Sequence, residues 1–222
     1  MINGRPQKRP RHSHSIMAQS GAPMFLWALV GVMTTIELWL SLSSSHLLGV
    51  IDYRQTAWLL GAFWQPVLSG LVQPVYPGQK VLMFVTYAFL HSGLVHLVVN
   101  SAILLALGKF ISSQIGTHKT LLVLSVSTIT AAAFFGLIST SNEPMIGASG
   151  AVFGLIGAWQ AVKCQLLKNA GASIQPVVIE ILGLIIANIL VYTILSGRLA
   201  WETHLGGWLT GGLLGFTFNR HQ

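Results

Sequence analysis

The chain has 222 residues, of which 53% are hydrophobic and only 8% are charged, and its mean hydropathy is +0.68. A soluble domain carries about a quarter of charged residues, so this composition excludes an ordinary soluble protein and indicates an integral membrane protein. The formal net charge of +7 does not indicate a nucleic-acid partner, because four of the twelve basic residues lie at or before Arg11. The single cysteine, Cys164, excludes an intrachain disulfide.

Residues 1–20 form a basic segment ahead of the first apolar run. This segment lacks the short apolar core and the small-residue cleavage site of a secretory signal. Its four basic residues are Arg5, Lys8, Arg9 and Arg11. We therefore expect a cytoplasmic tail, followed at residues 21–222 by a single membrane domain.

The apolar segments predict six membrane-spanning helices, because crossing a bilayer takes about 20 apolar residues. The six segments are roughly 23–43, 81–108, 119–139, 148–167, 176–195 and 200–218. The stretch 56–72 is a seventh candidate, but Gly61, Pro66 and Gly70 interrupt it. If it does not span, nine of the twelve Lys and Arg residues share the amino-terminal side, whereas a seventh span would leave six on each side. We expect an all-α protein with six transmembrane helices, a partly embedded loop between the first two, and both termini in the cytosol.

Ser149 and His204 are polar residues inside apolar segments, where a polar group is costly and calls for an explanation. With six spans, each lies at the outer end of its helix, so the two share one side of the membrane and a similar shallow depth. His96 and Asn100, in the outer half of the second span, are one helical turn apart and share a face. We therefore expect four polar groups from three helices to meet in one layer of the membrane.

This set of residues suits acyl transfer. A serine hydroxyl becomes nucleophilic beside a base, and histidine is the usual base. The amide of Asn100, a ring nitrogen of His96 and the backbone N–H of the serine at a helix start could donate to an oxyanion. Glu202 would point about 200° away from His204 on a helix. Glu143, in the loop before the serine, remains an alternative partner, but we predict a two-residue dyad.

Glycines at four-residue spacing predict close packing between the fourth and sixth spans. Small residues four apart let membrane helices approach one another closely. They are Gly150 and Gly154 on the fourth span and Gly207 and Gly211 on the sixth. Phe153, one turn after Ser149, is placed to pack against the imidazole of His204.

Other interpretations of the same residues stay open. A serine between glycines is more often a packing residue than a nucleophile. His91, His96 and His204 could form a zinc site, although the first two are five residues apart and suit shared ligation poorly. A proton transporter is disfavoured because no inverted repeat is evident. We predict no metal and no cofactor, and we expect the intramembrane Glu37 to be protonated or hydrogen-bonded to a Ser or Thr.

Three motifs, in this order, resemble those of the rhomboid intramembrane serine proteases, and the resemblance covers about residues 20–220. The motifs are His91-(x)4-His96-(x)3-Asn100, Gly147-Ala148-Ser149-Gly150-(x)2-Phe153 and His204-(x)2-Gly207-(x)3-Gly211. The resemblance implies a six-helix bundle around a shortened fourth helix, with a cavity open to the outer face. It also implies hydrolysis of peptide bonds in or near transmembrane segments of membrane-protein substrates, without metal or nucleotide.

The resemblance also implies a role for each matching residue. Ser149 would be the nucleophile, His204 the base, and His96 and Asn100 the oxyanion donors. The residues in supporting roles would be Gly147, His91 and Phe153. The implied partners are transmembrane substrates within membrane lipid, with no nucleic acid and with the oligomeric state left open. The alternative is an inactive rhomboid-like protein that binds transmembrane clients.

One departure from the family concerns the loop between the first two spans. Many rhomboids have a Trp-Arg pair ahead of the His-rich segment, where this chain has Leu82-Met83, and Arg54 lies in the same loop out of register. The departure leaves the loop geometry open and is compatible with a divergent subfamily of narrower substrate range. We expect a bacterial plasma membrane as the location, and the plain apolar fifth span, 176–195, as the lateral gate for substrates.

Overall fold

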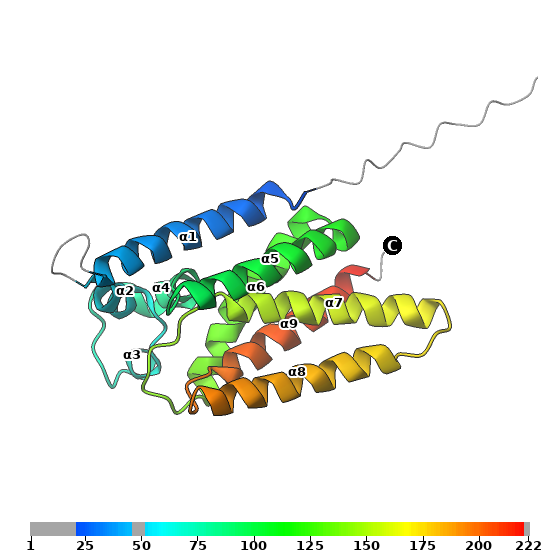
Figure 1. The fold of residues 1–222 in the computed structure, drawn as a ribbon. Helices are drawn as coiled ribbons and strands as arrows, with labels where there is room; N and C mark the ends of the chain where they lie inside the picture. The colour runs from blue at the N-terminus through cyan, green and yellow to red at the C-terminus, as the bar shows by residue number, and fades with distance from the viewer. Residues whose placement is uncertain (1–20, 46–51, 220–222) are drawn as a thin grey trace, which may run out of the picture.

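The computed structural model describes residues 21–45 and 52–219, and within these ranges the chain consists of helices and the loops that join them (Figure 1). The predicted tail, residues 1–20, lies outside the described residues. In chain order the helices are α1 (Met24–Ser44), α2 (Tyr53–Gly61), α3 (Gln65–Ser69), α4 (Gln79–Thr86), the 3₁₀ turn η1 (Tyr87–Phe89), α5 (Leu94–Ile115), α6 (Thr117–Ile138), α7 (Ser149–Asn169), α8 (Gln175–Ile194) and α9 (Trp201–Asn219).

The long helices α1 and α5 to α9 lie side by side as a bundle, which confirms the predicted all-α membrane protein (Figure 1). Within the described part of the chain, five helices are long and apolar enough to cross a membrane, namely α1, α5, α6, α7 and α8. α9 has a similar length, 19 residues, but is less apolar because it carries Glu202, His204 and several glycines. Except in the second span, the helix ends lie close to the predicted ones.

The predicted start of the second span is wrong. We expected this span at residues 81–108, but α5 begins at Leu94 and ends at Ile115, and the residues before it form α4 and η1. The chain turns at residues 90–93, where Gly93 has a φ of 151°, a backbone conformation that favours glycine. Because the apolar sequence runs across this turn without an acidic residue, Lys or Arg, hydropathy alone does not locate the break.

The seam between α7 and α9 is formed by backbone against backbone. A Cβ atom added at Gly207 would overlap the carbonyl oxygen of Gly150, and one added at Gly211 would overlap that of Gly154. Only glycine permits such an approach, so the two helices meet along these residues. α7 has 61% of its span buried within the protein, whereas α8, at the edge of the bundle, has 6% (Figure 1). On α8 a Cβ at Gly183 would meet no atom within 4 Å.

The loop between α1 and α5 forms a cap at one end of the bundle, where α5, α7 and α9 also begin (Figure 1). The stretch 56–72 does not form one continuous helix, because α2 ends at Gly61 and α3 ends before Gly70, which has a φ of 85°. Phe63, between α2 and α3, exchanges two backbone hydrogen bonds with Met145, at 3.0 and 2.9 Å. The cap is therefore joined directly to the segment that leads into α7.

Candidate active site

The segment before α7 places the first turn of that helix. Gly147 has a φ of 114°, and its N–H donates to the carbonyl oxygen of Tyr87 at 2.9 Å. α7 then begins at the half-buried Ser149, and the preceding Ala148 supplies no side-chain cap. The N–H groups of a first helical turn have no partner within the helix, and the helix dipole is positive there. This helix start therefore favours a negative charge beside Ser149.

The imidazole of His204 lies against the same helix. His204 is on the first turn of α9, and only 8% of the residue is exposed. Its ring is stacked on that of Phe153, with the ring centres 3.9 Å apart and the planes inclined by 7°. Because Phe153 is one turn after Ser149 on α7, the stacking places the imidazole on the part of α7 that carries the serine.

Two polar side chains of α5 reach the same helix start. A Cβ added at Gly147 would lie 2.7 and 2.8 Å from Cε1 and Nε2 of His96, and 3.8 Å from Nδ2 of Asn100. The other ring nitrogen of His96, Nδ1, is 3.2 Å from the hydroxyl of Ser92. Nδ2 of Asn100 is buried and has no hydrogen-bond partner among the described residues. A buried donor without a partner is costly, so this amide is suited to an oxygen of a bound molecule.

Asn188 is a polar neighbour of His204 that sequence reasoning missed. It lies on α8, and its Oδ1 is 2.6 Å from Nδ1 of His204. The sequence did carry a signal for Asn188, because an amide side chain inside a strongly apolar span is unusual. Among the described residues neither Glu143 nor Glu202 is hydrogen-bonded to this imidazole, and no direct hydrogen bond joins it to Ser149.

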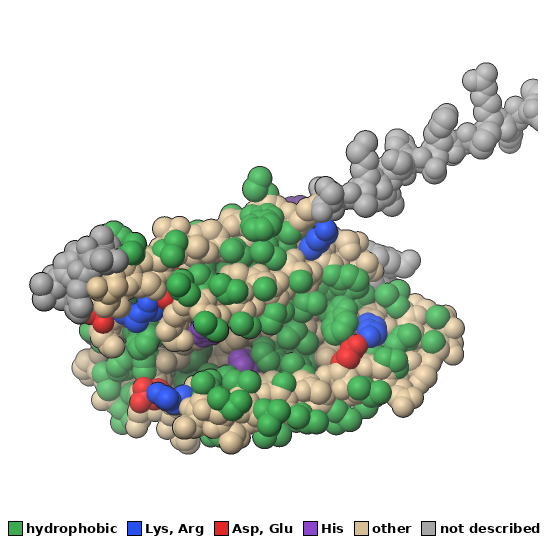
Figure 2. Space-filling model, viewed as in Figure 1, with side chains coloured by type: hydrophobic (Ala, Val, Ile, Leu, Met, Phe, Trp, Pro, Cys, Tyr) green, Lys and Arg blue, Asp and Glu red, His purple; other side chains and the backbone are tan. Residues whose placement is uncertain are grey.

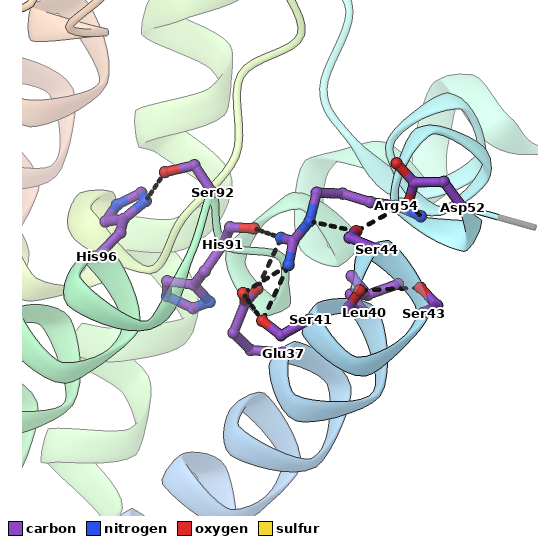
Figure 3. Close-up of polar contacts among 10 residues, drawn as sticks. All are labelled: Glu37, Leu40, Ser41, Ser43, Ser44, Asp52, Arg54, His91, Ser92 and His96. Carbon is purple, nitrogen blue, oxygen red and sulfur yellow. Dashed lines mark hydrogen bonds and ion pairs between the residues drawn. The ribbon is translucent and has the colours of Figure 1, made fainter. Parts of the chain in front are cut away.

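A buried ion pair connects α1 to the cap and to the His-rich segment (Figure 3). The guanidinium of Arg54 donates to both carboxylate oxygens of Glu37, at 2.8 and 3.1 Å, and to the carbonyl oxygen of His91 at 2.9 Å. Ser41 donates to the same carboxylate at 3.0 Å. The expected serine hydrogen bond of Glu37 is therefore present, but its main partner is Arg54, which the sequence did not indicate.

His91 packs against His96. It is fully buried, and its ring lies 5.1 Å from that of His96 at an angle of 71°. His91 precedes α5, and burial, together with the neighbouring His96, lowers its pKa to about 4. The ring is therefore neutral at pH 7 and packs as an uncharged group.

Two cavities lie along α8, and the second of them borders the candidate site. One, of about 630 Å³, lies between α5, α7 and α8 and is lined mainly by apolar residues such as Ile103, Ile156 and Leu184. The other, of about 530 Å³, lies between α7, α8 and α9, and His204 forms part of its wall. Figure 2 shows histidine side chains within a hollow on the face between α5 and α8, surrounded by apolar side chains. The polar groups are therefore reached through apolar surroundings.

Known proteins similar to this chain share one family. The family described as Rhomboid domain matches residues 78–221. Rhomboid-like protease 3 of Toxoplasma gondii is 30% identical over 176 residues, which are 75% of this chain and 60% of that protein. Rhomboid protease GluP of Bacillus subtilis is 23% identical over 212 residues, 92% of this chain and 37% of that protein. Inactive RHOMBOID-like protein 8 of Arabidopsis thaliana is 33% identical over 79 residues, 36% of this chain and 22% of that protein. The chain thus spans less than two thirds of the length of each of these relatives.

Proposed function

This chain belongs to the rhomboid family, and on that premise we propose that it is an intramembrane serine endopeptidase that cleaves peptide bonds in or near transmembrane segments of membrane proteins. The observation that carries the proposal is the stacking of His204 on Phe153, one turn after Ser149. It brings a base to the helix start that bears the only hydroxyl in the first turn of α7. The side chains of His96 and Asn100 lie beside Gly147, two residues before Ser149.

The proposed reaction proceeds through an acyl-enzyme. The imidazole of His204 takes the hydroxyl proton of Ser149 while Oγ bonds to the carbonyl carbon of the scissile peptide, and the carbonyl electrons move to its oxygen. The tetrahedral intermediate then collapses, and the imidazolium gives its proton to the leaving amine. Water attacks the acyl-enzyme with the same imidazole as base, which releases the carboxylate product and restores Ser149. The direct hydrogen bond between base and nucleophile often tightens only when substrate is bound.

The oxyanion would be held by three donors. They are the unpartnered Nδ2 of Asn100, Nε2 of His96 and the backbone N–H of Ser149. Such donors lie ready before the charge develops, and deletion of one costs about 3–4 kcal/mol of activation free energy. When the hydroxyl of Ser92 donates to Nδ1 of His96, Nε2 carries the hydrogen and can donate to the oxyanion.

Substrates would enter from the lipid past α8. This helix is the least buried of the five apolar spans, and the cavity of about 630 Å³ separates part of it from α5. Cleavage requires a locally unwound substrate helix, because an intact helix engages its peptide carbonyls. Residues of low helix propensity such as Gly and Pro should therefore favour cleavage, and their replacement by Leu should slow it.

The proposed setting is a multi-pass protein of the plasma membrane of a bacterium. In this arrangement residues 1–20 form a cytoplasmic tail, residues 21–222 form one membrane protease domain, and the site opens to the outer face. The asymmetric distribution of Lys and Arg supports this orientation. The proposed partners are transmembrane substrates and the surrounding lipid.

A second candidate function is the binding of transmembrane clients without proteolysis. The observation that favours it is the similarity to a relative named as inactive. The presence of both Ser149 and His204 favours the protease, because a client-binding protein has no chemical need for the pair.

A fluorophosphonate probe separates the two candidates. The purified chain in detergent is labelled alongside Ser149→Ala and His204→Ala, with Ser113→Ala, an exposed serine near the far end of α5, as a matched control. We expect the parent and the control to be labelled and the other two variants to stay unlabelled. A folded parent that takes no label, yet binds a transmembrane client, would favour the second candidate.

A further inference from the structure

α8 contributes one polar side chain to the candidate site. Asn188 is half-buried on this helix, with Oδ1 at 2.6 Å from Nδ1 of His204. Its amide nitrogen Nδ2 donates to the carbonyl oxygen of Leu184, one turn earlier, at 2.9 Å. Both ends of the amide are therefore engaged.

These two contacts determine which amide atom faces the imidazole. If the amide of Asn188 were turned over, Oδ1 would face the carbonyl oxygen of Leu184, and two acceptors would meet with no hydrogen between them. Since Oδ1 is the acceptor, Nδ1 of His204 must carry the hydrogen. A neutral imidazole has one N–H, so Nε2 keeps a free lone pair.

We propose that Asn188 is a positioning residue that holds His204 in the tautomer whose Nε2 is the base. The inference rests on the proposed dyad of Ser149 and His204. Stacking on Phe153 fixes the plane of the ring, and the hydrogen bond to Asn188 fixes the rotation of the ring within that plane. The two contacts together leave Nε2 as the free nitrogen of an oriented ring.

The same hydrogen bond assists proton transfer. When the hydroxyl proton of Ser149 moves to Nε2 and Oγ bonds to the substrate carbonyl carbon, the ring becomes an imidazolium. Nδ1–H then donates to Oδ1 of Asn188 as a charge-assisted hydrogen bond, which is stronger than the neutral one. The amide therefore stabilises the charged ring more than the neutral ring, which lowers the barrier to attack.

The location of Asn188 makes this support dependent on α8. Asn188 and His204 both border the cavity of about 530 Å³, whose other walls include Ile185 and Trp208. Because α8 is the least buried of the five apolar spans, a displacement of this helix beyond hydrogen-bond distance would release the imidazole. The imidazole is oriented in this way only while Asn188 stays within hydrogen-bond distance of it.

Substitutions of Asn188 distinguish a positioning role from a purely structural one, because the two roles predict opposite orders of activity for Leu and Asp. If Asn188 served only to pack α8, Leu would be a suitable replacement and Asp a poor one, because a carboxyl group is costly in an apolar span. If Asn188 orients His204, Asp keeps an acceptor oxygen at the same place and Leu removes it.

The kinetic test compares Asn188→Leu, Asn188→Asp and the control Ile186→Ala, an exposed residue of the same helix that lines neither cavity. The readouts are probe labelling, and kcat and KM for a fluorescent model substrate with one transmembrane helix. We expect Asn188→Leu to lower kcat and the labelling rate about tenfold, because the variant loses one hydrogen bond to the base. KM should change little. Asn188→Asp should retain more activity than Asn188→Leu. Parental rates in Asn188→Leu, or a higher rate for Leu than for Asp, would overturn the inference.

A second measurement does not depend on activity. In protein labelled with ¹⁵N-histidine, the His204 signals are identified by their loss in His204→Gln. We expect the hydrogen on Nδ1 in the parent and a mixture of tautomers in Asn188→Leu. A parent with the hydrogen on Nε2, or an unchanged tautomer in Asn188→Leu, would contradict the role of Asn188. An inactive parent would refute the proposed protease, while the tautomer would still decide the role of Asn188.

Discussion

His204 lies between two unlike neighbours. On one side α9 meets α7 backbone to backbone, at glycines where any Cβ would overlap a carbonyl oxygen. On the other side α8 is held through the amide of Asn188 and an ion pair between Lys163 and Glu180, and little of this helix is buried within the protein. The His204 ring is thus held by two closely packed helices, α7 and α9, and receives one further hydrogen bond from the loosely packed α8.

This difference suits the proposed hydrolytic site, which must be both ordered and accessible inside a bilayer. The proposed nucleophile, base and oxyanion donors are carried by α5, α7 and α9, and the cap ties the start of α7 to the rest of the bundle. α8 carries no group that contacts the reacting atoms in the proposed reaction. A displacement of α8 would therefore leave them in place, and the proposed hydrogen bond of Asn188 would orient the base when α8 lies in its present position.

The largest effect should come from a side chain placed in the seam. We expect Gly211→Val to lower the free energy of unfolding by more than about 4 kcal/mol, because its Cβ would overlap the carbonyl oxygen of Gly154 and the backbones must separate. Gly183→Val on α8, where the space is open, should change it by about 0.5 kcal/mol or less. Unfolding in detergent, followed by circular dichroism, measures both. Equal losses in the two variants would remove the distinction between the seam and α8.

A smaller loss is expected when the cap is released from α1. Arg54→Leu would leave the fully buried carboxylate of Glu37 without its cation, at a cost of about 3–5 kcal/mol. Arg54→Leu combined with Glu37→Leu removes both charges and should recover most of that stability. The same unfolding measurement applies. A double variant as unstable as Arg54→Leu alone would mean that the ion pair is not the source of the effect.

The next effect depends on pH. The pKa of the buried His91 is lowered to about 4. The stability that the neutral His91 contributes is therefore fully present above its pKa in the unfolded chain, about 6.5. It is lost as the pH falls towards 4. Between pH 7.5 and 4.5 the parent should lose about 2–3 kcal/mol more unfolding free energy than His91→Gln, which does not titrate. Parallel curves for the two proteins would show that the buried imidazole is not responsible.

The smallest effect concerns the ion pair between α7 and α8. Lys163 and Glu180 are 30% and 28% exposed. Their replacement together, as Lys163→Gln with Glu180→Gln, should change the unfolding free energy by less than about 1 kcal/mol. Cleavage of a model substrate should persist in this variant. A loss as large as that of Gly211→Val would mean that α8 is held as firmly as the seam.

Most of the fold could be predicted from the sequence because length and hydropathy indicate where most of the long helices begin and end, although α9 is less apolar than the five spans that hydropathy supports. The exception is α5, where the turn at residues 90–93 lies inside an uninterrupted apolar run. Hydropathy measures the cost of exposing a segment to lipid, and it contains no information on the direction of a helix. The four-residue glycine spacing did carry such information for α7 and α9, because close approach depends on the absence of side chains.

The candidate site was predicted only where its residues form a local pattern. Ser149, His96 and Asn100 follow helix starts or helical spacing, so their common location could be reasoned from topology. The contacts of Arg54 with Glu37 and of Asn188 with His204 join segments 17 and 16 residues apart. Which residues pair in these contacts depends on how α1, α8 and α9 pack, and residue spacing in the sequence does not predict that packing. An unexplained polar residue in an apolar span was the signal in each case.

Peptide cleavage in reconstituted proteoliposomes tests the central claim most directly. A fluorescent model substrate, with one transmembrane helix that contains Gly and Pro near its outer end, is incubated with the parent, with Ser149→Ala and with the control Ile186→Ala. We predict that the parent and Ile186→Ala cleave the substrate at the same rate and that Ser149→Ala gives no product. Full cleavage by a folded Ser149→Ala would contradict the proposed serine protease.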